Sequence, residues 1–329
     1  MSYIIILTLF SFIFSNEVCF EIESNPEPLH PGLSNFTKYV HVLDCFHVYA
    51  EPSINDAKVL HVAAVVAELL DNNEDGIVDD PGIEILLRES NAMIPVFLSE
   101  FSPSMDDVWN YYEGCVSAAL FKNEINPSQP GYWGEDATVE EVLHTINVCG
   151  HVEMYPSTFN LAPNSSLMSD AMDIARGGQF INIPNQYPES AWYHYDDWTC
   201  DYECMAVEYL YWCIVSHMGL LDNIQICNGI DNEWELCSPE LFQSIDLLMY
   251  SIITSSEYNL PHLAPDGNYC PSSVQGDLNY DGVINISDII ILVNSIITGV
   301  YSIQNDLNLD SQNDILDIIY LVNIILDVN

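Results

Sequence analysis

The feature that most constrains this chain is a repeat at its C-terminal end. The stretch GDLNYDGVINISDIIILVNSII, which begins at Gly276, returns as NDLNLDSQNDILDIIYLVNIIL, with an offset of 29 residues from Asp277 to Asp306. Each copy starts with alternating oxygen-bearing side chains and continues into an apolar run of helical period. A repeated unit of this kind indicates one supersecondary element, a loop followed by a helix, used twice.

The oxygen-bearing side chains have the spacing of a calcium loop. In the first copy, positions 1, 3, 5, 9 and 12 are Asp277, Asn279, Asp281, Asn285 and Asp288, and the carbonyl at position 7 is that of Val283. In the second copy they are Asp306, Asn308, Asp310, Asp314 and Asp317, with the carbonyl of Gln312 at position 7. Calcium takes six to eight oxygen ligands, which this alternation supplies. The tail is therefore predicted to bind calcium.

An ordinary EF-hand has a helix before the loop and Glu at position 12, whereas here PSSVQG precedes the first loop and position 12 is Asp. This pair of half EF-hands resembles dockerin, the module that attaches secreted enzymes to cohesin-bearing scaffold proteins. The resemblance implies a small all-α domain over residues 272–329 and a cohesin-like partner. It also implies that the partner is contacted by Ile286, Ser287, Ile315 and Leu316. Ser311 replaces the turn glycine, so weaker calcium binding is expected in the second loop.

The charge balance excludes some classes of function. Five Lys and Arg residues stand against 49 Asp and Glu residues, which gives a net charge of −44. Nucleic-acid binding needs basic residues that displace counterions from phosphates, and binding to an anionic membrane needs basic clusters. Neither is expected. A hydrophobic fraction of 49% favours a globular chain, and its mixed strand and helix patterns predict a helix-rich α+β domain with a small sheet over residues 16–271.

The N-terminal stretch and the cysteines indicate secretion. Residues 1–15 are mostly apolar but too short to span a bilayer, so they are expected to be a signal peptide, and no membrane association is expected after its removal. The chain has ten cysteines, an even count that favours disulfides in a secreted protein. Cys227 and Cys237 are predicted to close a local loop. Cys200 and Cys204 are not expected to pair, because residues four apart on a helix hold their Cβ atoms too far apart.

The segment GYWGEDATVEEVLHTINVCGH, residues 131–151, is the candidate for chemistry. Thr138 and Glu141 have capping-box spacing, which predicts a helix from Val139. Glu140 and His144 then lie one turn apart on one face, with Glu141 beside them. The order Glu-Glu-x-x-His resembles the HExxH helix of zincin metallohydrolases with its first His replaced by Glu. The resemblance implies Glu140 and His144 as zinc ligands and Glu141 as the general base.

A third ligand is suggested by a buried acid further along the chain. Residues 201–217 are apolar on nearly all sides, which predicts a buried helix with Glu208 in its middle. A buried carboxylate needs a partner. In one branch of the zincins a later helix supplies a Glu ligand, a role that Glu208 would take. The other partners considered are Arg176 and a proton. Arg176 itself is expected to be a counter-ion of Asp170 or Asp173.

Two other segments carry predictions. Residues 38–51 alternate between apolar and polar side chains, which predicts one strand with His41 and His47 on the same face. Residues 55–72 have helical periodicity and end in a further acidic loop. That loop is a possible calcium site through Asp71, Asn73, Asp75, the carbonyl of Ile77, and Asp79, although its position 12 is Gly82 rather than an acid.

Three functions remain open for the large domain. The first is a secreted metal-dependent hydrolase with the zinc ligands and base named above. The second is a glycoside hydrolase that uses two carboxylates, such as Glu141 and Glu208. The third is a non-catalytic extracellular module stiffened by calcium. Metal analysis separates the first from the other two.

Overall fold

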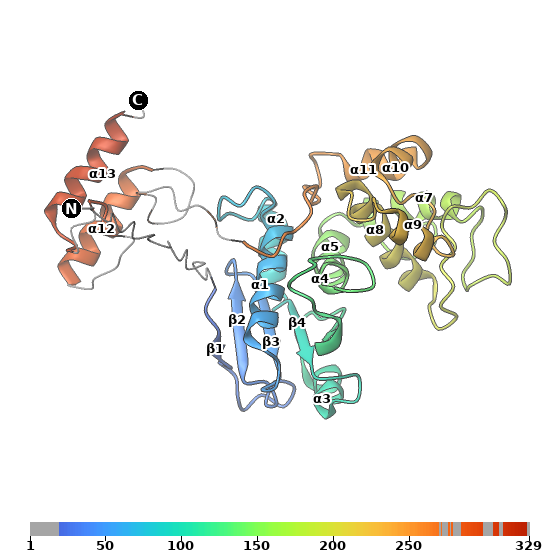
Figure 1. Ribbon diagram of the computed structural model, residues 1–329, viewed down its shortest axis with the longest axis horizontal. Coiled ribbons are helices and arrows are strands. Elements are labelled where there is room, and N and C mark those ends of the chain that lie inside the picture. Colours follow the sequence, from blue (N-terminus) through green and yellow to red (C-terminus); the bar gives the residue numbers. More distant parts are fainter. Residues whose placement is uncertain are drawn as a thin grey trace, which may run out of the picture.

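The computed structural model describes residues 20–269, 271, 276, 278, 284–298, 305–308 and 312–327. The predicted signal peptide lies outside these residues. The described large domain is α+β and helix-rich, as predicted, with a small mixed sheet at one side and a group of helices at the other (Figure 1). Among the described residues, no helix has both the length and the apolar character needed to cross a membrane.

The sheet has five strands in sequence order. They are β1 (Glu23–Ser24), β2 (Lys38–Val42), β3 (Phe46–Ala50), β4 (Met93–Phe97) and β5 (Leu120–Phe121). The first three are joined antiparallel, while β3 to β4 and β4 to β5 are parallel. A parallel neighbour requires a crossover connection, which α1 (Asp56–Leu70) and α2 (Pro81–Glu89) provide between β3 and β4.

The segment expected to be one strand is a hairpin. Leu43 and Asp44 have φ values of 47° and 53°, and the Cys45 amide donates to the Val42 carbonyl, so the chain reverses in a tight turn. Two successive positive φ angles suit the right-handed twist of paired strands. The prediction was wrong because neither residue is the glycine or asparagine that marks such turns. The two-histidine face was correct: His41 pairs with His47, and their rings stack at 4.9 Å.

The remaining helices of the large domain follow the sheet along the chain. They are α3 (Pro103–Tyr111), α4 (Thr138–Ile146), α5 (Val152–Met154), α6 (Pro156–Phe159), α7 (Leu167–Ala175), α8 (Tyr202–Met218), α9 (Ile224–Ile230), α10 (Pro239–Ile245) and α11 (Leu247–Ile253). A short 3₁₀ turn, η1 (Lys122–Glu124), follows β5, and α4 continues into a π-helical turn, η2 (Asn147–His151). Such π turns are frequent at functional sites.

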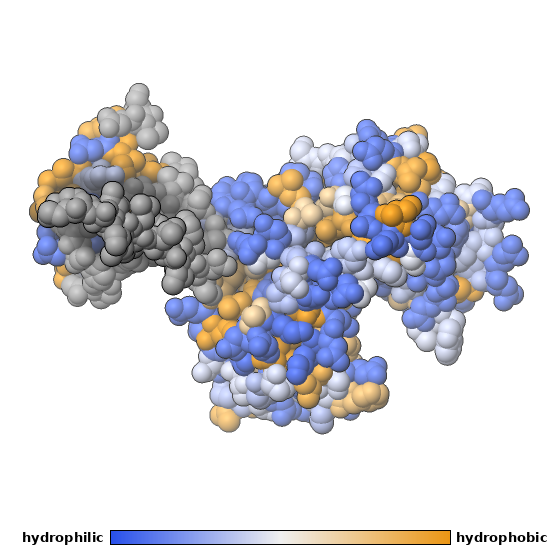
Figure 2. All heavy atoms as spheres, in the orientation of Figure 1, coloured by the Kyte–Doolittle hydropathy of each residue, from blue (hydrophilic) through white to orange (hydrophobic). Residues whose placement is uncertain are grey.

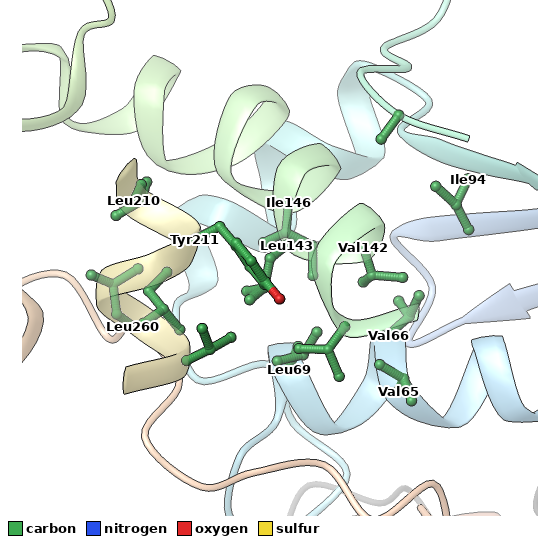
Figure 3. Packing of buried hydrophobic residues seen from close by; sticks show 14 of the residues in the cluster. Val65, Val66, Leu69, Ile94, Val142, Leu143, Ile146, Leu210, Tyr211 and Leu260 are labelled. Carbon is green, nitrogen blue, oxygen red and sulfur yellow. The ribbon is translucent and has the colours of Figure 1, made fainter. Parts of the chain in front are cut away.

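The hydrophobic core lies where α4 packs between α1 and α8, with the sheet against α1 and α4. Helix α4 contacts α1, α8 and β4, so it is enclosed by other elements. Figure 3 shows the meeting point, with Val65, Val66 and Leu69 from α1, Val142, Leu143 and Ile146 from α4, and Leu210 and Tyr211 from α8. Burial on this scale holds α4 and α8 in fixed positions relative to each other, which sets the geometry of the site described below.

Three disulfides are found among the described residues. They are Cys115–Cys149, Cys200–Cys204 and Cys227–Cys237. The predicted Cys227–Cys237 pair is confirmed. The prediction against Cys200–Cys204 was wrong because α8 begins only at Tyr202, so Cys200 precedes the helix and the two Cα atoms lie 5.4 Å apart. Within the described residues Cys45 and Cys213 are free and buried. Three disulfides are consistent with an extracellular protein.

The last turn of α1, together with Asn72 just after it, binds the C-terminal segment of the large domain. Glu68 accepts hydrogen bonds from the backbone amides of Asp266 and Gly267, and Asn72 accepts from those of His262 and Leu263. Because Glu68 is buried, its pKa is raised to about 7, against the opposing effect of the two amide donors.

We expect this glutamate to make stability depend on pH. The folded pKa of Glu68 exceeds the ordinary value of 4.5, so its contribution is complete below about pH 4.5 and is lost as pH rises through about 7. Relative to Glu68→Gln, the wild type should lose on the order of 3 kcal/mol over that range. Chemical denaturation at pH 4.5 and pH 8 measures it. The exposed Glu89→Gln is the control, and parallel profiles for the two variants would contradict the assignment.

The described part of the tail contains two helices, α12 (Ile286–Thr298) and α13 (Ile315–Asp327). They pack against each other around Leu292, Leu307 and Leu321, which form a hydrophobic cluster separate from the main core. The helix predicted after each loop is therefore present in both copies of the repeat. The described parts of both helices also show apolar side chains on the surface, coloured orange in Figure 2.

Candidate metal centre

Helix α4 carries three of the predicted site residues. It begins at Thr138, and its N-cap residue, Ala137, makes no side-chain cap bond. The predicted capping box is therefore wrong. The Thr138 hydroxyl donates instead to Asp136, whose carboxylate is fixed by His61 and by the amide of Gly131. Because the Thr138 hydroxyl is bonded to Asp136, it does not cap the helix. The helix therefore starts at Thr138, one residue before the predicted Val139.

Helix α8 brings the fourth residue to the same place. Asp201 caps its N-terminus by accepting from the Cys204 amide, and Gly219 ends it in the left-handed conformation with φ 76°. The predicted helix of residues 201–217 is confirmed within one residue at each end. The middle of α8 is buried against α4, so Glu208 projects from α8 towards the α4 face that carries His144.

Glu140, His144 and Glu208 converge. The Nε2 atom of His144 lies 3.5 Å from a Glu208 oxygen and 4.0 Å from a Glu140 oxygen, and one ligand atom from each residue falls within 4.8 Å of the others. These three form the one group of His, Cys, Asp and Glu among the described residues that has this geometry. The convergence of the predicted trio is confirmed, although the sequence could not fix its distances.

The spacing suits one shared cation. Two ligands that lie about 2.1 Å from a zinc ion at the tetrahedral angle are about 3.4 Å apart. The observed separations from His144 are close to this value and longer than an ordinary hydrogen bond of about 2.7–3.2 Å. An imidazole and two carboxylates are a suitable donor set for a divalent transition metal. The residues present therefore fit such an ion.

The electrostatics of the group are those of crowded acids. Burial lowers the pKa of His144, but the carboxylate of Glu208, followed by those of Glu141 and Glu140, outweighs burial and raises the pKa to about 9. Burial raises the pKa of Glu140 to about 7 and that of Glu141 to about 8. The raised pKa values mean that these groups bind protons near neutral pH. A divalent cation would neutralise the same negative charge.

Glu141 stands beside the group without belonging to it. It lies three residues before His144 on α4, a spacing that places both on one face of the helix. The Glu141 side chain is half-buried. Burial raises its pKa, and the charge of His144 opposes this rise. Glu141 is not one of the converging ligands, so its carboxyl remains available to exchange a proton.

Several neighbours of the group were not predicted. The Tyr211 ring meets the His144 ring edge-on at 5.7 Å, and the pKa of Tyr211 is raised by burial and by Glu140 and Glu208. Besides burial, the charges of Glu233 and Glu124 also raise the pKa of Glu140. Tyr211 is three residues after Glu208, so helical spacing was a usable signal. Glu124 and Glu233 come from distant segments and gave none.

Arg176 is not the partner of Glu208, nor the predicted counter-ion of Asp170 or Asp173. Its buried guanidinium donates to the Phe180 carbonyl, and the described residues show no ion pair to it. It lies among the rings of Phe180, Tyr187 and Tyr202, with centroids 5.4–5.9 Å away. The buried charge is therefore stabilised by aromatic faces and a carbonyl.

The acidic loop after α1 uses its side chains on its own backbone. Asp71 accepts from the amides of Asp75 and Gly76 and from the Tyr269 hydroxyl, and Asp75 accepts from the Ile77 amide. Asn73 accepts from the Asp75 amide, and Asp79 from that of Asn72. The three acids do not converge as the trio does. Calcium binding by this loop stays a prediction.

Part of the predicted calcium ligands of the tail can be placed. Asp277, Asn279, Asp281, Val283 and Asp310 lie outside the described residues. Asp288 is buried and accepts from the amides of Leu278 and Asn285; Asp317 is buried and accepts from those of Asn308 and Asp314. In each loop the carboxylate at position 12 thus accepts hydrogen bonds from two backbone amides of the same loop. The predicted partner residues Ile286, Ser287, Ile315 and Leu316 are all exposed.

Comparisons with known proteins give no family for this chain. No model of a protein family matches it, and no significant match is found among curated proteins or solved structures.

Proposed function

We propose that the large domain is a metal-dependent hydrolase with a mononuclear centre at Glu140, His144 and Glu208. The observation that carries the proposal is the convergence of three ligand atoms, from two helices, within 4.8 Å. Zinc is the first candidate. Because two of the three ligands are carboxylates, the site is less Lewis-acidic than a His-His-Glu site, and a harder divalent metal is the alternative.

The residues divide into holding and proton-transfer roles. Glu140 and His144 hold the ion from α4, and Glu208 holds it from α8. When bound, the ion would lower the pKa of a coordinated water to about 7. Glu141 would accept the proton of that water, because it lies beside the ligands on α4 and is not itself one of the converging group. Tyr211 packs edge-on against His144 and orients its ring.

The proposed base is tested by Glu141→Gln. We expect the variant to keep the metal stoichiometry of the wild type and to lose about 10²–10⁴-fold in turnover, since proton transfer contributes that much. The measurements are elemental analysis and hydrolysis of a peptide and ester panel by the metal-loaded protein. Glu203→Gln, an exposed change on α8, is the control. Loss of metal from Glu141→Gln, or full activity in it, would contradict the role.

The glycoside hydrolase alternative uses Glu141 and Glu208 as its two carboxylates. That chemistry needs no imidazole beside either acid, whereas His144 lies 3.5 Å from Glu208. This position favours the metal centre. A glycosidase would keep its activity after chelation of transition metals, and the metal-dependent enzyme would lose it.

We also propose that the tail is a dockerin-like docking module that folds around calcium. Support comes from the paired helices, the buried acids that close each loop, and the exposed apolar side chains at both loop–helix junctions. Ile286, Ile315 and Leu316 are 68%, 62% and 50% exposed. A cohesin-like scaffold is the proposed partner, and secretion is the proposed route to it.

A further inference from the structure

A hollow of about 420 Å³ lies outside the metal centre, and its lining includes none of Glu140, His144 and Glu208. It is formed by the loop 183–189 and by two segments that run antiparallel, 192–196 and 232–235. The loop belongs to the long connection between α7 and α8, which extends past α9 at the right of Figure 1. Nothing in the proposed hydrolysis uses this hollow.

Buried side chains and hydrogen bonds fix the walls of the hollow. Tyr193 and Trp234 face each other across the two segments and are fully buried, and the Tyr193 hydroxyl donates to the Met205 carbonyl on α8. On the loop side, the Tyr187 hydroxyl donates to the Tyr195 carbonyl at 2.7 Å. The buried guanidinium of Arg176 supports the inner side of the Tyr187 ring. The hollow is therefore preorganised rather than formed by loose loops.

The lining has a consistent chemical character. Its carboxylates are Glu189, Asp196 and Glu235, and it contains no Lys or Arg. The imidazole of His194 lies 3.7 Å from Glu235 and 2.9 Å from the Ala191 carbonyl. Three like charges around one hollow raise the local concentration of cations and repel anions. The lining therefore favours a positively charged group over an anion.

The other lining residues favour a peptide over a simple cation. Pro184, Pro188 and the Tyr187 ring offer apolar surface, which suits a methylene stem. Asn185, Gln186 and Asn232 offer amides, each of which donates and accepts and so pairs with a peptide group in both directions. An alkylammonium group on a peptide backbone uses all three kinds of surface.

The two antiparallel segments also pack against α8, the helix that carries Glu208. The His194 amide donates to the Glu233 carbonyl, which joins the two segments. The Tyr193 hydroxyl donates to the Met205 carbonyl, and the Tyr193 ring lies 5.4 Å from that of Tyr209, the neighbour of Glu208 on α8. The segments that form one wall of the hollow are therefore held by the helix that supplies one of the three ligands.

We propose that the hollow is the substrate subsite of the metal centre and takes the lysine side chain of a polypeptide. Its position as a subsite rests on the proposed hydrolase function. Its binding of a lysine peptide does not, since none of its lining residues is a proposed metal ligand.

The test is a binding titration of the full-length protein with acetyl-Gly-Lys-Gly amide and with its norleucine analogue, which lacks the ammonium group. We expect the lysine peptide to bind at least about tenfold more tightly, and the advantage to shrink as salt rises. Asp196→Asn, alone and with Glu235→Gln, should remove the advantage. Glu203→Gln with Glu240→Gln changes net charge equally at exposed positions elsewhere and should preserve it.

The outcomes separate this inference from the hydrolase proposal. Lysine binding that persists in metal-stripped protein, with normal metal affinity in the Asp196 and Glu235 variants, is the expected result. Equal binding of the norleucine peptide, or glucosamine binding as tightly as the lysine peptide, would overturn the lysine subsite while leaving the metal centre intact. Lysine binding without any metal binding would reject the hydrolase and keep the hollow as a peptide site.

Discussion

Replacing His144 with alanine is expected to remove metal binding from the large domain. His144 is the only nitrogen ligand of the converging group, and it lies between Glu208 and Glu140. Without it two carboxylates remain, so affinity should fall by more than the 10–100-fold that is typical of outer-shell changes. Titration of metal-stripped protein with zinc measures the effect. His262→Ala, an exposed histidine, is the matched control and should leave affinity unchanged.

The competing account is a buried ion pair without a metal. A protonated His144 between two carboxylates agrees with the same distances to Glu208 and Glu140. Its pKa, raised to about 9, would keep it charged. In that account wild-type and His144→Ala proteins bind zinc equally weakly. The substitution then acts on stability alone and costs about 3–5 kcal/mol, as removal of one partner from a buried pair does. Zinc titration of both proteins therefore decides between the two accounts.

Calcium is expected to have the second large effect, on the tail. The two loop sequences contain seven carboxylates: Asp277, Asp281, Asp288, Asp306, Asp310, Asp314 and Asp317. Calcium that binds only the folded tail stabilises it by about 2.7 kcal/mol at a hundredfold excess over Kd. Hydrogen exchange of the full-length protein should show stronger protection of α12 and α13 in calcium than in EDTA.

The acid at position 12 supplies the control for this effect. Asp288→Ala removes a buried acceptor of two loop amides and a predicted ligand, so protection of α12 should no longer respond to calcium. Asp106→Asn, an exposed change on α3, should respond like the wild type. Protection that is the same in calcium and EDTA for the unmodified chain would contradict calcium-coupled folding.

Local spacing explains how much of the site was predictable. Glu140 and His144 are one helical turn apart, so their meeting followed from periodicity alone. Glu208 was found because a carboxylate in an apolar helix needs a partner, an argument that requires no knowledge of the fold. That the partner was His144 rather than Arg176 depended on how α8 packs on α4. Glu124 and Glu233 reach the group through tertiary structure only, which no local pattern records.

The errors in the fold have a common cause. The hairpin at Leu43–Asp44, the early start of α4 and the Cys200–Cys204 disulfide all depend on one or two residues at an element boundary. Periodicity identifies the interior of a helix or strand, where the pattern repeats. At its ends, one side-chain contact decides, such as the hydrogen bond from Thr138 to Asp136. Boundaries were therefore less predictable than the elements themselves.

X-ray absorption spectroscopy of the zinc-loaded, full-length protein tests the central claim most directly. The account predicts a four-coordinate zinc with one imidazole nitrogen at about 2.0–2.1 Å and carboxylate and water oxygens at about 2.0–2.2 Å. The imidazole signature should disappear in His144→Ala and persist in His262→Ala. A zinc shell of oxygens alone in the wild type, or an imidazole signal that His144→Ala leaves unchanged, would contradict a metal centre at Glu140, His144 and Glu208.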